Sequence, residues 1–114
     1  MTINEIYLEI GQNIYNIIED DDFVEATLMI ERLEKFVAYK GSCNMLNGNK
    51  KSLDVRYLEI NSNSIHTLHS ITTKNGHNHW NKLKFTLLPT FKFDLQFIWD
   101  QKFQDEIDEY NKTQ

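Results

Sequence analysis

The chain of 114 residues has a single cysteine, a single proline and four glycines. One cysteine excludes an internal disulfide and fits a reducing compartment, and we expect Cys43 to be a small buried residue rather than a nucleophile. The glycines form no phosphate-binding motif. No apolar run approaches the roughly 20 residues of a membrane span, and the N-terminus shows no signal-peptide pattern. We therefore expect one cytoplasmic domain, residues 1–114, built around one core.

Acidic residues are concentrated at both ends of the chain, whose net charge is −5. Residues 1–34 hold nine acidic residues against one arginine, and residues 91–114 hold six against three lysines. Residues 35–90 hold eight basic residues against two acidic ones. If the two ends lie close together in the fold, they form one negative surface.

Two alternating runs near the C-terminus predict a β-hairpin. In residues 83–87 and 93–99 apolar residues stand at every second position, and a turn that contains Pro89 separates the two runs. We expect the apolar face of this hairpin to pack against the first and last helices, with its aromatic row in the core. That row comprises Phe85, Phe93, Phe97 and Trp99. Trp80 precedes the hairpin beside polar residues, so it is a candidate for an exposed interface anchor.

Residues 2–19 are predicted to form a helix, because isoleucines recur there at steps of three and four residues. Thr2 and Glu5 match a capping box at its start. Residues 23–33 alternate between apolar and polar side chains, which predicts a strand with one solvated face. Residues 35–43 predict a second strand, which pairs with the first through a tight turn.

In residues 47–74, residues typical of turns and helix caps mark where the next elements begin. Asn47 and Gly48 predict a turn. The alternation of Leu53, Val55 and Tyr57 then favours a third short strand, although Leu58 and Ile60 also fit the start of a helix. Residues 62–74 should form a helix with Ser62 or Asn63 as its N-cap. Its inward-facing residues are expected to be Ile65, Leu68 and Ile71.

A last helix is predicted over residues 100–111, with Asp100 as its N-cap. Its buried stripe should consist of Phe103, Ile107 and Tyr110. The order is thus α-β-β-(β)-α-β-β-α. It predicts an α+β fold, an antiparallel sheet of four to five strands with helices packed mainly on one face.

Four histidines are clustered in sequence: His66, His69, His77 and His79. Imidazole pairs at this spacing can chelate zinc or nickel, but no cysteine or carboxylate completes a recognised ligand motif. We expect no metal and no cofactor, with one or two histidines at the end of a helix instead. An enzyme built on these histidines is a third-ranked alternative, because no nucleophile motif surrounds the nearby serines and threonines.

The basic middle of the chain raises the alternative of a small nucleic-acid-associated or regulatory domain. Lysines and an arginine there, with aromatic and histidine neighbours, could contact phosphates and stack on bases. These residues are Lys50, Lys51, Arg56, Tyr57, Lys74, His77, His79, Trp80, Lys82 and Lys84. The pI of about 5.3 and the acidic flanks oppose binding to a polyanion. The lysines are therefore expected to solvate a polar sheet face.

Aromatic motifs near both ends resemble a known family. Trp80 before a strand, the run Phe91-Lys92-Phe93-Asp94 and the pair Trp99-Asp100 resemble the C-terminal hairpin of the YezG-like immunity proteins. Residues 4–11 resemble the opening helix of that family, although the middle of this chain looks shorter than in many relatives. The resemblance implies a bacterial antitoxin that neutralises a polymorphic or contact-dependent toxin.

The acidic segments give this implied function an expected binding surface. A negative patch suits a toxin that is itself a nuclease, because it can occupy a basic cleft and speed association. The expected toxin-binding residues are Glu19, Asp20, Asp21, Asp22, Trp80, Asp100, Asp105, Glu106, Asp108 and Glu109. We expect stoichiometric occlusion of the toxin domain, with no catalysis, no direct nucleic-acid or membrane binding and no small-molecule ligand.

Overall fold

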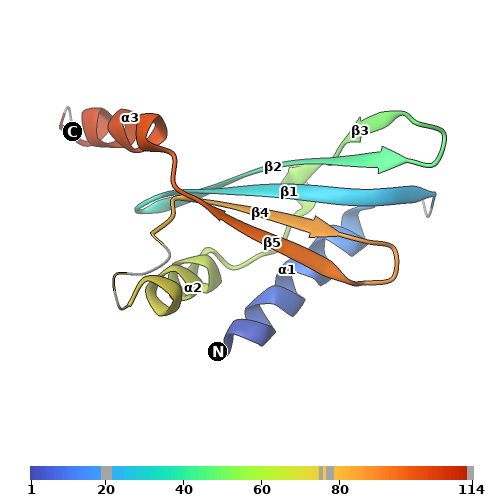
Figure 1. The fold of residues 1–114 in the computed structure, drawn as a ribbon, viewed down its shortest axis with the longest axis horizontal. Helices are drawn as coiled ribbons and strands as arrows, with labels where there is room; N and C mark the ends of the chain where they lie inside the picture. Colours follow the sequence, from blue (N-terminus) through green and yellow to red (C-terminus); the bar gives the residue numbers. More distant parts are fainter. Residues whose placement is uncertain (19–21, 75, 77–78, 113–114) are drawn as a thin grey trace.

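The computed structural model describes residues 1–18, 22–74, 76 and 79–112. Within this part, three α-helices, a short 3-10 helix and five strands follow one another in the expected order (Figure 1). They are α1 (Ile3–Ile17), β1 (Phe23–Leu33), β2 (Phe36–Met45), β3 (Lys50–Ser52), η1 (Val55–Tyr57), α2 (Ser62–Thr73), β4 (Lys82–Leu87), β5 (Phe93–Ile98) and α3 (Gln101–Lys112). The predicted α+β class is confirmed.

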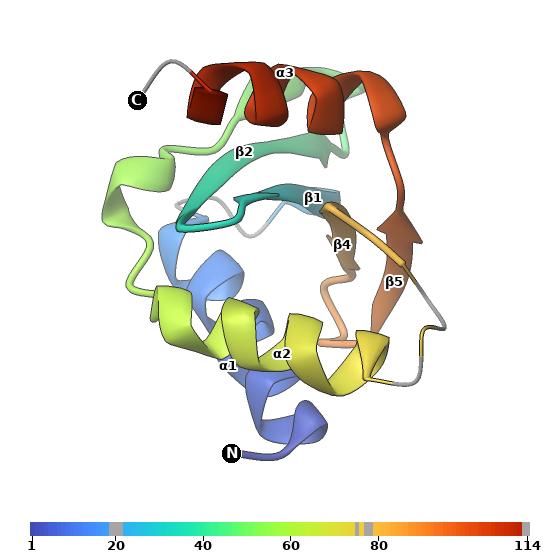
Figure 2. The ribbon, with the colours of Figure 1, turned by 90° about the vertical axis from the view of Figure 1, so that its left-hand side faces the viewer.

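The strands form one antiparallel sheet in the order β3-β2-β1-β4-β5, with the long strand β1 in its centre. Figure 2 shows α1 and α2 on one face of the sheet and α3 on the other. The face opposite α1 and α2 is called the open face below. The expectation that the last helix covers the apolar side of the C-terminal hairpin is therefore wrong, because α1 and α2 lie on that side.

The core lies between the sheet and the first two helices. Side chains on β1 alternate as predicted, with Ala26, Leu28 and Ile30 fully buried, whereas Thr27 and Met29 are partly exposed on the open face. Core residues on the neighbouring elements are Ile6, Ile10, Ile14, Ile65, Leu68, Leu83, Phe85 and Leu87. Each such side chain contributes about 1.5–3 kcal/mol through its removal from water, which makes this layer the main source of stability.

Local signals place several element ends as predicted. The Thr2 hydroxyl accepts from the Glu5 backbone N–H at 3.2 Å, and the Glu5 carboxylate accepts from the Thr2 N–H at 3.0 Å, which completes the capping box. Glu34, at a φ of 66°, turns β1 tightly into β2. Gly48, at a φ of 87°, forms the turn into β3, a conformation that glycine adopts without strain.

Two local predictions are wrong for the same physical reason, side-chain hydrogen bonds to the nearby backbone. The third strand ends at Ser52, because Asp54 accepts from the Arg56 backbone N–H at 3.2 Å and starts η1 instead. The cap of α2 is Asn61 rather than Ser62 or Asn63, since the Asn61 side chain accepts from the Asn63 N–H at 2.9 Å. In both places a short polar side chain accepts from a backbone N–H two residues later and so sets where a helix begins.

Some predicted core residues are exposed. Ile71 is 41 % exposed on α2, and Tyr110 is 61 % exposed on α3. Phe93 is 37 % exposed on β5, an edge strand with a neighbour on one side only, and Trp99 is 37 % exposed in the link between β5 and α3. Cys43 agrees with its prediction, since it is buried with its thiol 3.5 Å from the sulfur of Met45.

Candidate partner-binding site

The two acidic segments do not form one surface where the structure describes them. Glu19, Asp20 and Asp21 lie outside the described residues, and exposed Asp22 stands directly before β1. At the other end of β1, the Glu34 carboxylate accepts from Gln104 and Asn111 of α3, both at 3.2 Å. An 11-residue strand is about 33 Å long, so Asp22 and α3 occupy opposite ends of the molecule (Figure 1). The predicted single patch is wrong for Asp22 and α3.

A polar cluster fixes the start of α3 to the sheet. Asn81, 3 % exposed, donates to the Asp100 carbonyl at 2.9 Å and accepts from the Asp100 N–H at 2.9 Å. The Asp100 carboxylate accepts from the Phe103 N–H at 3.0 Å and lies 3.0 Å from the Lys82 ammonium. The Phe103 N–H, followed by Lys82, lowers the pKa of Asp100. Asp100 is therefore the helix cap that was predicted, and its carboxylate is already occupied by groups of this chain.

Buried Glu31 extends the same cluster. Its carboxylate lies 3.5 Å from the Lys82 ammonium and 3.4 Å from the Lys40 ammonium, although it was expected on a solvated face. The Lys82 ammonium also lies 4.6 Å from the centre of the Phe103 ring. The hydrogen bond and charge of Asp100, with the charge of Glu31, outweigh desolvation and raise the pKa of Lys82. This network ties β1, β2 and β4 to the first turn of α3.

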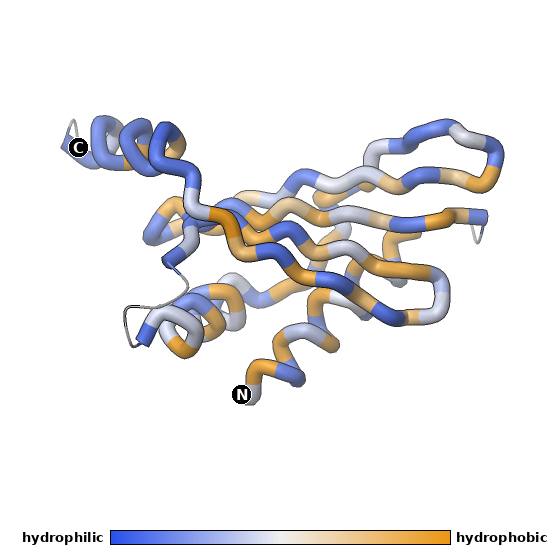
Figure 3. Tube along the Cα trace, viewed as in Figure 1, coloured by the Kyte–Doolittle hydropathy of each residue, from blue (hydrophilic) through white to orange (hydrophobic). Residues whose placement is uncertain are grey.

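The remaining four expected acidic residues of α3 are exposed: Asp105, Glu106, Asp108 and Glu109. Two of them accept from glutamines one turn earlier, Asp105 from Gln101 at 2.9 Å and Asp108 from Gln104 at 3.1 Å. Within the helix, Ile107 is the one buried residue. Figure 3 shows mostly hydrophilic residues along α3, in contrast to the mixed pattern of α1. The helix therefore presents carboxylates to solvent from a fixed base.

An apolar hollow, the α3 groove, lies between α3 and the β1–β2 turn. Its lining residues are Leu33, Lys35, Phe36, Phe103, Glu106, Ile107, Tyr110 and Asn111, and its volume is about 230 Å³. Phe36 is 69 % exposed and was not expected in any site. The sequence pattern could have identified this exposed residue. Leu33 and Phe36 are paired across β1 and β2, at positions where the alternation of the two strands predicts polar side chains.

Trp80 is 1 % exposed, so its predicted role as an exposed anchor is wrong. Its indole N–H donates to the Thr72 hydroxyl at 2.8 Å, and its ring lies 5.2 Å from Phe97 and 4.9 Å from His69. The polar sequence neighbours of Trp80 are misleading, because α2 closes over the indole from a distant part of the chain.

The described histidines contact other protein groups. His66 accepts from the Arg32 side chain at 3.1 Å, the His69 ring lies 3.1 Å from the Trp80 carbonyl oxygen, and the His79 ring lies 4.0 Å from Trp99. His77 lies outside the described residues. Across residues 1–18, 22–74, 76 and 79–112, no group of three or more His, Cys, Asp or Glu residues could hold a metal ion.

Protonation of His69 should destabilise the fold in mild acid. Burial, followed by the charge of Arg32 and smaller contributions from His79 and His66, lowers the pKa of His69. The folded state favours neutral imidazole, so this stability is present above the ordinary pKa of about 6.5 and is lost as the pH falls through the lowered value. We expect the melting temperature to fall between about pH 7 and pH 5, and His69→Gln to reduce that slope.

The matched control is His79→Gln, which replaces an exposed imidazole and should retain most of the slope. Melting curves across the pH range, recorded for the three proteins in the same buffers, make the comparison. Equal slopes in all three would show that another group causes the acid sensitivity.

Several basic residues of the middle segment are paired with carboxylates. Arg56 donates to both Asp54 oxygens, at 2.9 and 2.8 Å, and Lys40 and Lys82 flank Glu31. On the open face, Lys84 shares its side of the sheet with Glu31. Lys40, Lys82 and Lys84 therefore lie on one face of the sheet beside Glu31.

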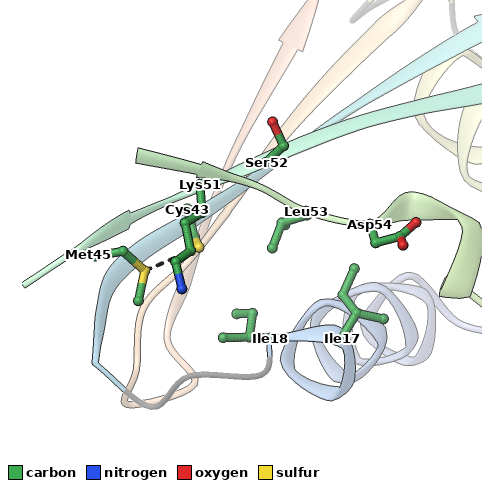
Figure 4. A pocket seen from close by; sticks show the side chains of 8 residues that line it. All are labelled: Ile17, Ile18, Cys43, Met45, Lys51, Ser52, Leu53 and Asp54. Carbon is green, nitrogen blue, oxygen red and sulfur yellow. Dashed lines mark hydrogen bonds between the residues drawn. The ribbon is translucent and has the colours of Figure 1, made fainter. Parts of the chain in front are cut away.

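A second hollow, of about 250 Å³, lies between the end of α1 and the β2–β3 edge of the sheet (Figure 4). It is lined by Ile17, Ile18, Cys43, Met45, Lys51, Ser52, Leu53 and Asp54. At this hollow the Cys43 thiol lies 3.5 Å from the Met45 sulfur.

Two comparisons with known proteins were informative only as negative results. A scan against protein-family models finds none that matches this chain, and a search of curated proteins finds no match either. No helix in the described part of the chain is long and apolar enough to cross a membrane. The functional argument therefore rests on the α3 groove and the charged surface around it.

Proposed function

We propose that this chain is an immunity protein, which binds and neutralises a cognate bacterial toxin domain in the cytoplasm by occluding it. One observation supports this most strongly: α3 is held firmly to the sheet, yet it buries little of its own surface. Ile107 is its one buried residue, whereas Tyr110 and four carboxylates face solvent. A helix that contributes so little to the core, but is fixed at its base, is suited to contact another protein.

The polar contacts of α3 support a preformed binding surface. The reciprocal pair between Asn81 and Asp100 fixes the start of the helix. The Glu34 carboxylate contacts both the first turn, through Gln104, and the last turn, through Asn111. A surface that is ordered before binding loses less conformational entropy when the complex forms. Tight stoichiometric inhibition depends on such preorganisation.

The chemistry of α3 supports a toxin with a basic active site, such as a nuclease. The helix carries four carboxylates against Lys102 and Lys112. Exposed carboxylates attract a basic cleft, speed the encounter and suppress binding to acidic proteins. The resemblance to YezG-like immunity proteins supplies the class of partner, and this helix supplies a means of binding it.

The test is protection from the polypeptide encoded immediately upstream of this gene. Its C-terminal domain is induced in a bacterial host with and without this chain, and viable cells are counted. We expect the domain to kill the host and equimolar expression of this chain to restore growth, with a one-to-one complex on size-exclusion chromatography. Killing that this chain leaves unchanged, together with a salt-dependent shift of labelled RNA or DNA by this chain, would favour the nucleic-acid alternative.

A further inference from the structure

The α3 groove has the size of a site for one side chain. Its volume of about 230 Å³ is below the roughly 300–1,000 Å³ of pockets that enclose small-molecule ligands. Leu33 and Phe36 of the sheet line it from one side and Phe103 and Tyr110 of α3 from the other, with Ile107 buried among them. An aliphatic or aromatic side chain is the occupant that such a lining favours.

Two aromatic residues on separate elements are exposed at this groove. Phe36 is 69 % exposed at the start of β2, and Tyr110 is 61 % exposed near the end of α3. Single exposed apolar residues are common on protein surfaces, but two aromatic rings that line one hollow suggest an interface. Aromatic residues in such positions often dominate binding energy once a partner covers them.

The charged residues beside the groove determine which residues of the partner are favoured next to the inserted side chain. Glu106 lines the groove, and Glu109 stands one helical turn further along the same side of α3. Lys35 lines the groove from the β1–β2 turn, and the Lys112 ammonium lies 4.0 Å from the Glu109 carboxylate at the far end of the helix. With Asp105 and Asp108, the helix still carries four carboxylates against two lysines. Lysine or arginine next to the inserted side chain would pair with these carboxylates, whereas acidic neighbours would be repelled.

We propose that the α3 groove receives one large aliphatic or aromatic side chain from a basic segment of the protein partner, flanked by lysine or arginine residues that contact Glu106 and Glu109. The inference rests on the proposed function, because it takes the toxin domain as the partner. It adds where the toxin binds and which chemistry its contacting segment carries.

Serine substitutions at the groove test this with matched controls. Phe36→Ser and Tyr110→Ser remove exposed rings of the groove, whereas Leu46→Ser and Tyr57→Ser remove side chains that are 71 % and 70 % exposed elsewhere. Calorimetric titration with the upstream-encoded toxin domain should show at least about 30-fold weaker binding for each groove variant, as for other aromatic hot spots. The two controls should bind within about threefold of the unchanged chain, as contacts outside a hot spot do.

The outcomes separate this inference from the proposed function. Tight binding by the unchanged chain and by both groove variants overturns the groove assignment and leaves the immunity function standing. Equal losses in groove and control variants also overturn it, because the effect would not be specific to the groove. If the unchanged chain does not bind the toxin domain at all, the proposed function fails.

A peptide probe tests the binding preference of the groove without the toxin domain. The probe is a capped pentapeptide with a central leucine between pairs of arginines, and its control has a central glycine. In nitrogen-15 NMR titrations of the intact chain, the leucine peptide should shift amide signals of residues 33–36 and 103–111 more than the glycine peptide does. Equal shifts with the two peptides, or shifts that gather elsewhere, overturn the assignment.

Discussion

Replacement of Trp80 by alanine is expected to lower the free energy of unfolding by about 3–5 kcal/mol, the usual cost of truncating a buried large aromatic residue. The indole is 1 % exposed, packs on Phe97 and His69, and donates to the Thr72 hydroxyl. The substitution opens a cavity between α2 and the hairpin and leaves the hydroxyl without its donor. Since domains of this size have about 5–15 kcal/mol of stability, urea unfolding should show a large shift in midpoint.

The other tryptophan provides the control. Trp99 is 37 % exposed, and its indole N–H donates to the Gln101 side chain at 3.0 Å on the surface. Trp99→Ala should cost about 1 kcal/mol, because surface contacts are replaced largely by water. A Trp99 variant as unstable as the Trp80 variant would contradict the assignment of one indole to the core and the other to the surface.

Reversal of the α3 charges should reduce protection strongly while the fold persists. The variant replaces Asp105, Glu106, Asp108 and Glu109 with lysine. These four side chains are exposed, and the buried Ile107 and the Asp100 cap are left unchanged, so circular dichroism should not change. We expect toxin association at low salt to slow by about tenfold or more, with a weaker dependence on salt concentration, measured by stopped-flow mixing.

The control for this variant reverses acidic residues elsewhere. Asp22→Lys changes a charge at the opposite end of β1, and Glu25→Lys with Asp94→Lys changes two on the sheet. Measured at 0.1 M salt, where charges beyond a Debye length of about 10 Å are screened, these variants should keep most of the association rate, whereas the α3 variant should still be slower. Full protection by the α3 variant, together with loss of protection in the controls, would place the toxin-binding surface away from α3.

Local patterns in the sequence predicted those elements whose structure depends on residues only a few positions apart in the chain. The isoleucine spacing of α1, the alternation of β1 and the Asp100 cap each arise from contacts over a few residues, and each was placed correctly. The order and class of the fold followed from these elements, since few arrangements bury one helix stripe and one sheet face together.

Positions that depend on distant parts of the chain could not be predicted in the same way. Trp80 has polar sequence neighbours, yet α2 buries it. Tyr110 follows a helical apolar spacing, yet it is exposed at one side of the α3 groove. Phe36 lines the α3 groove only because α3 packs beside the β1–β2 turn, a contact that joins Glu34 to Gln104 and Asn111. The sequence pattern tells which residues share a face, but not what lies opposite that face.

The central position of β1 also has a consequence for the order of folding. The β1–β2 and β4–β5 hairpins pair residues that are close in sequence, whereas the closest pair between β1 and β4, Glu31 and Lys82, is 51 positions apart. Hairpins close within about 1–10 μs, but a loop of this length must lose much more entropy before its contacts form. The two hairpins should therefore form first and join late along β1 and β4. Until they join, β1 and β4 each expose an edge of unpaired backbone groups, and this interval is the stage of folding at which the chain is most prone to aggregate.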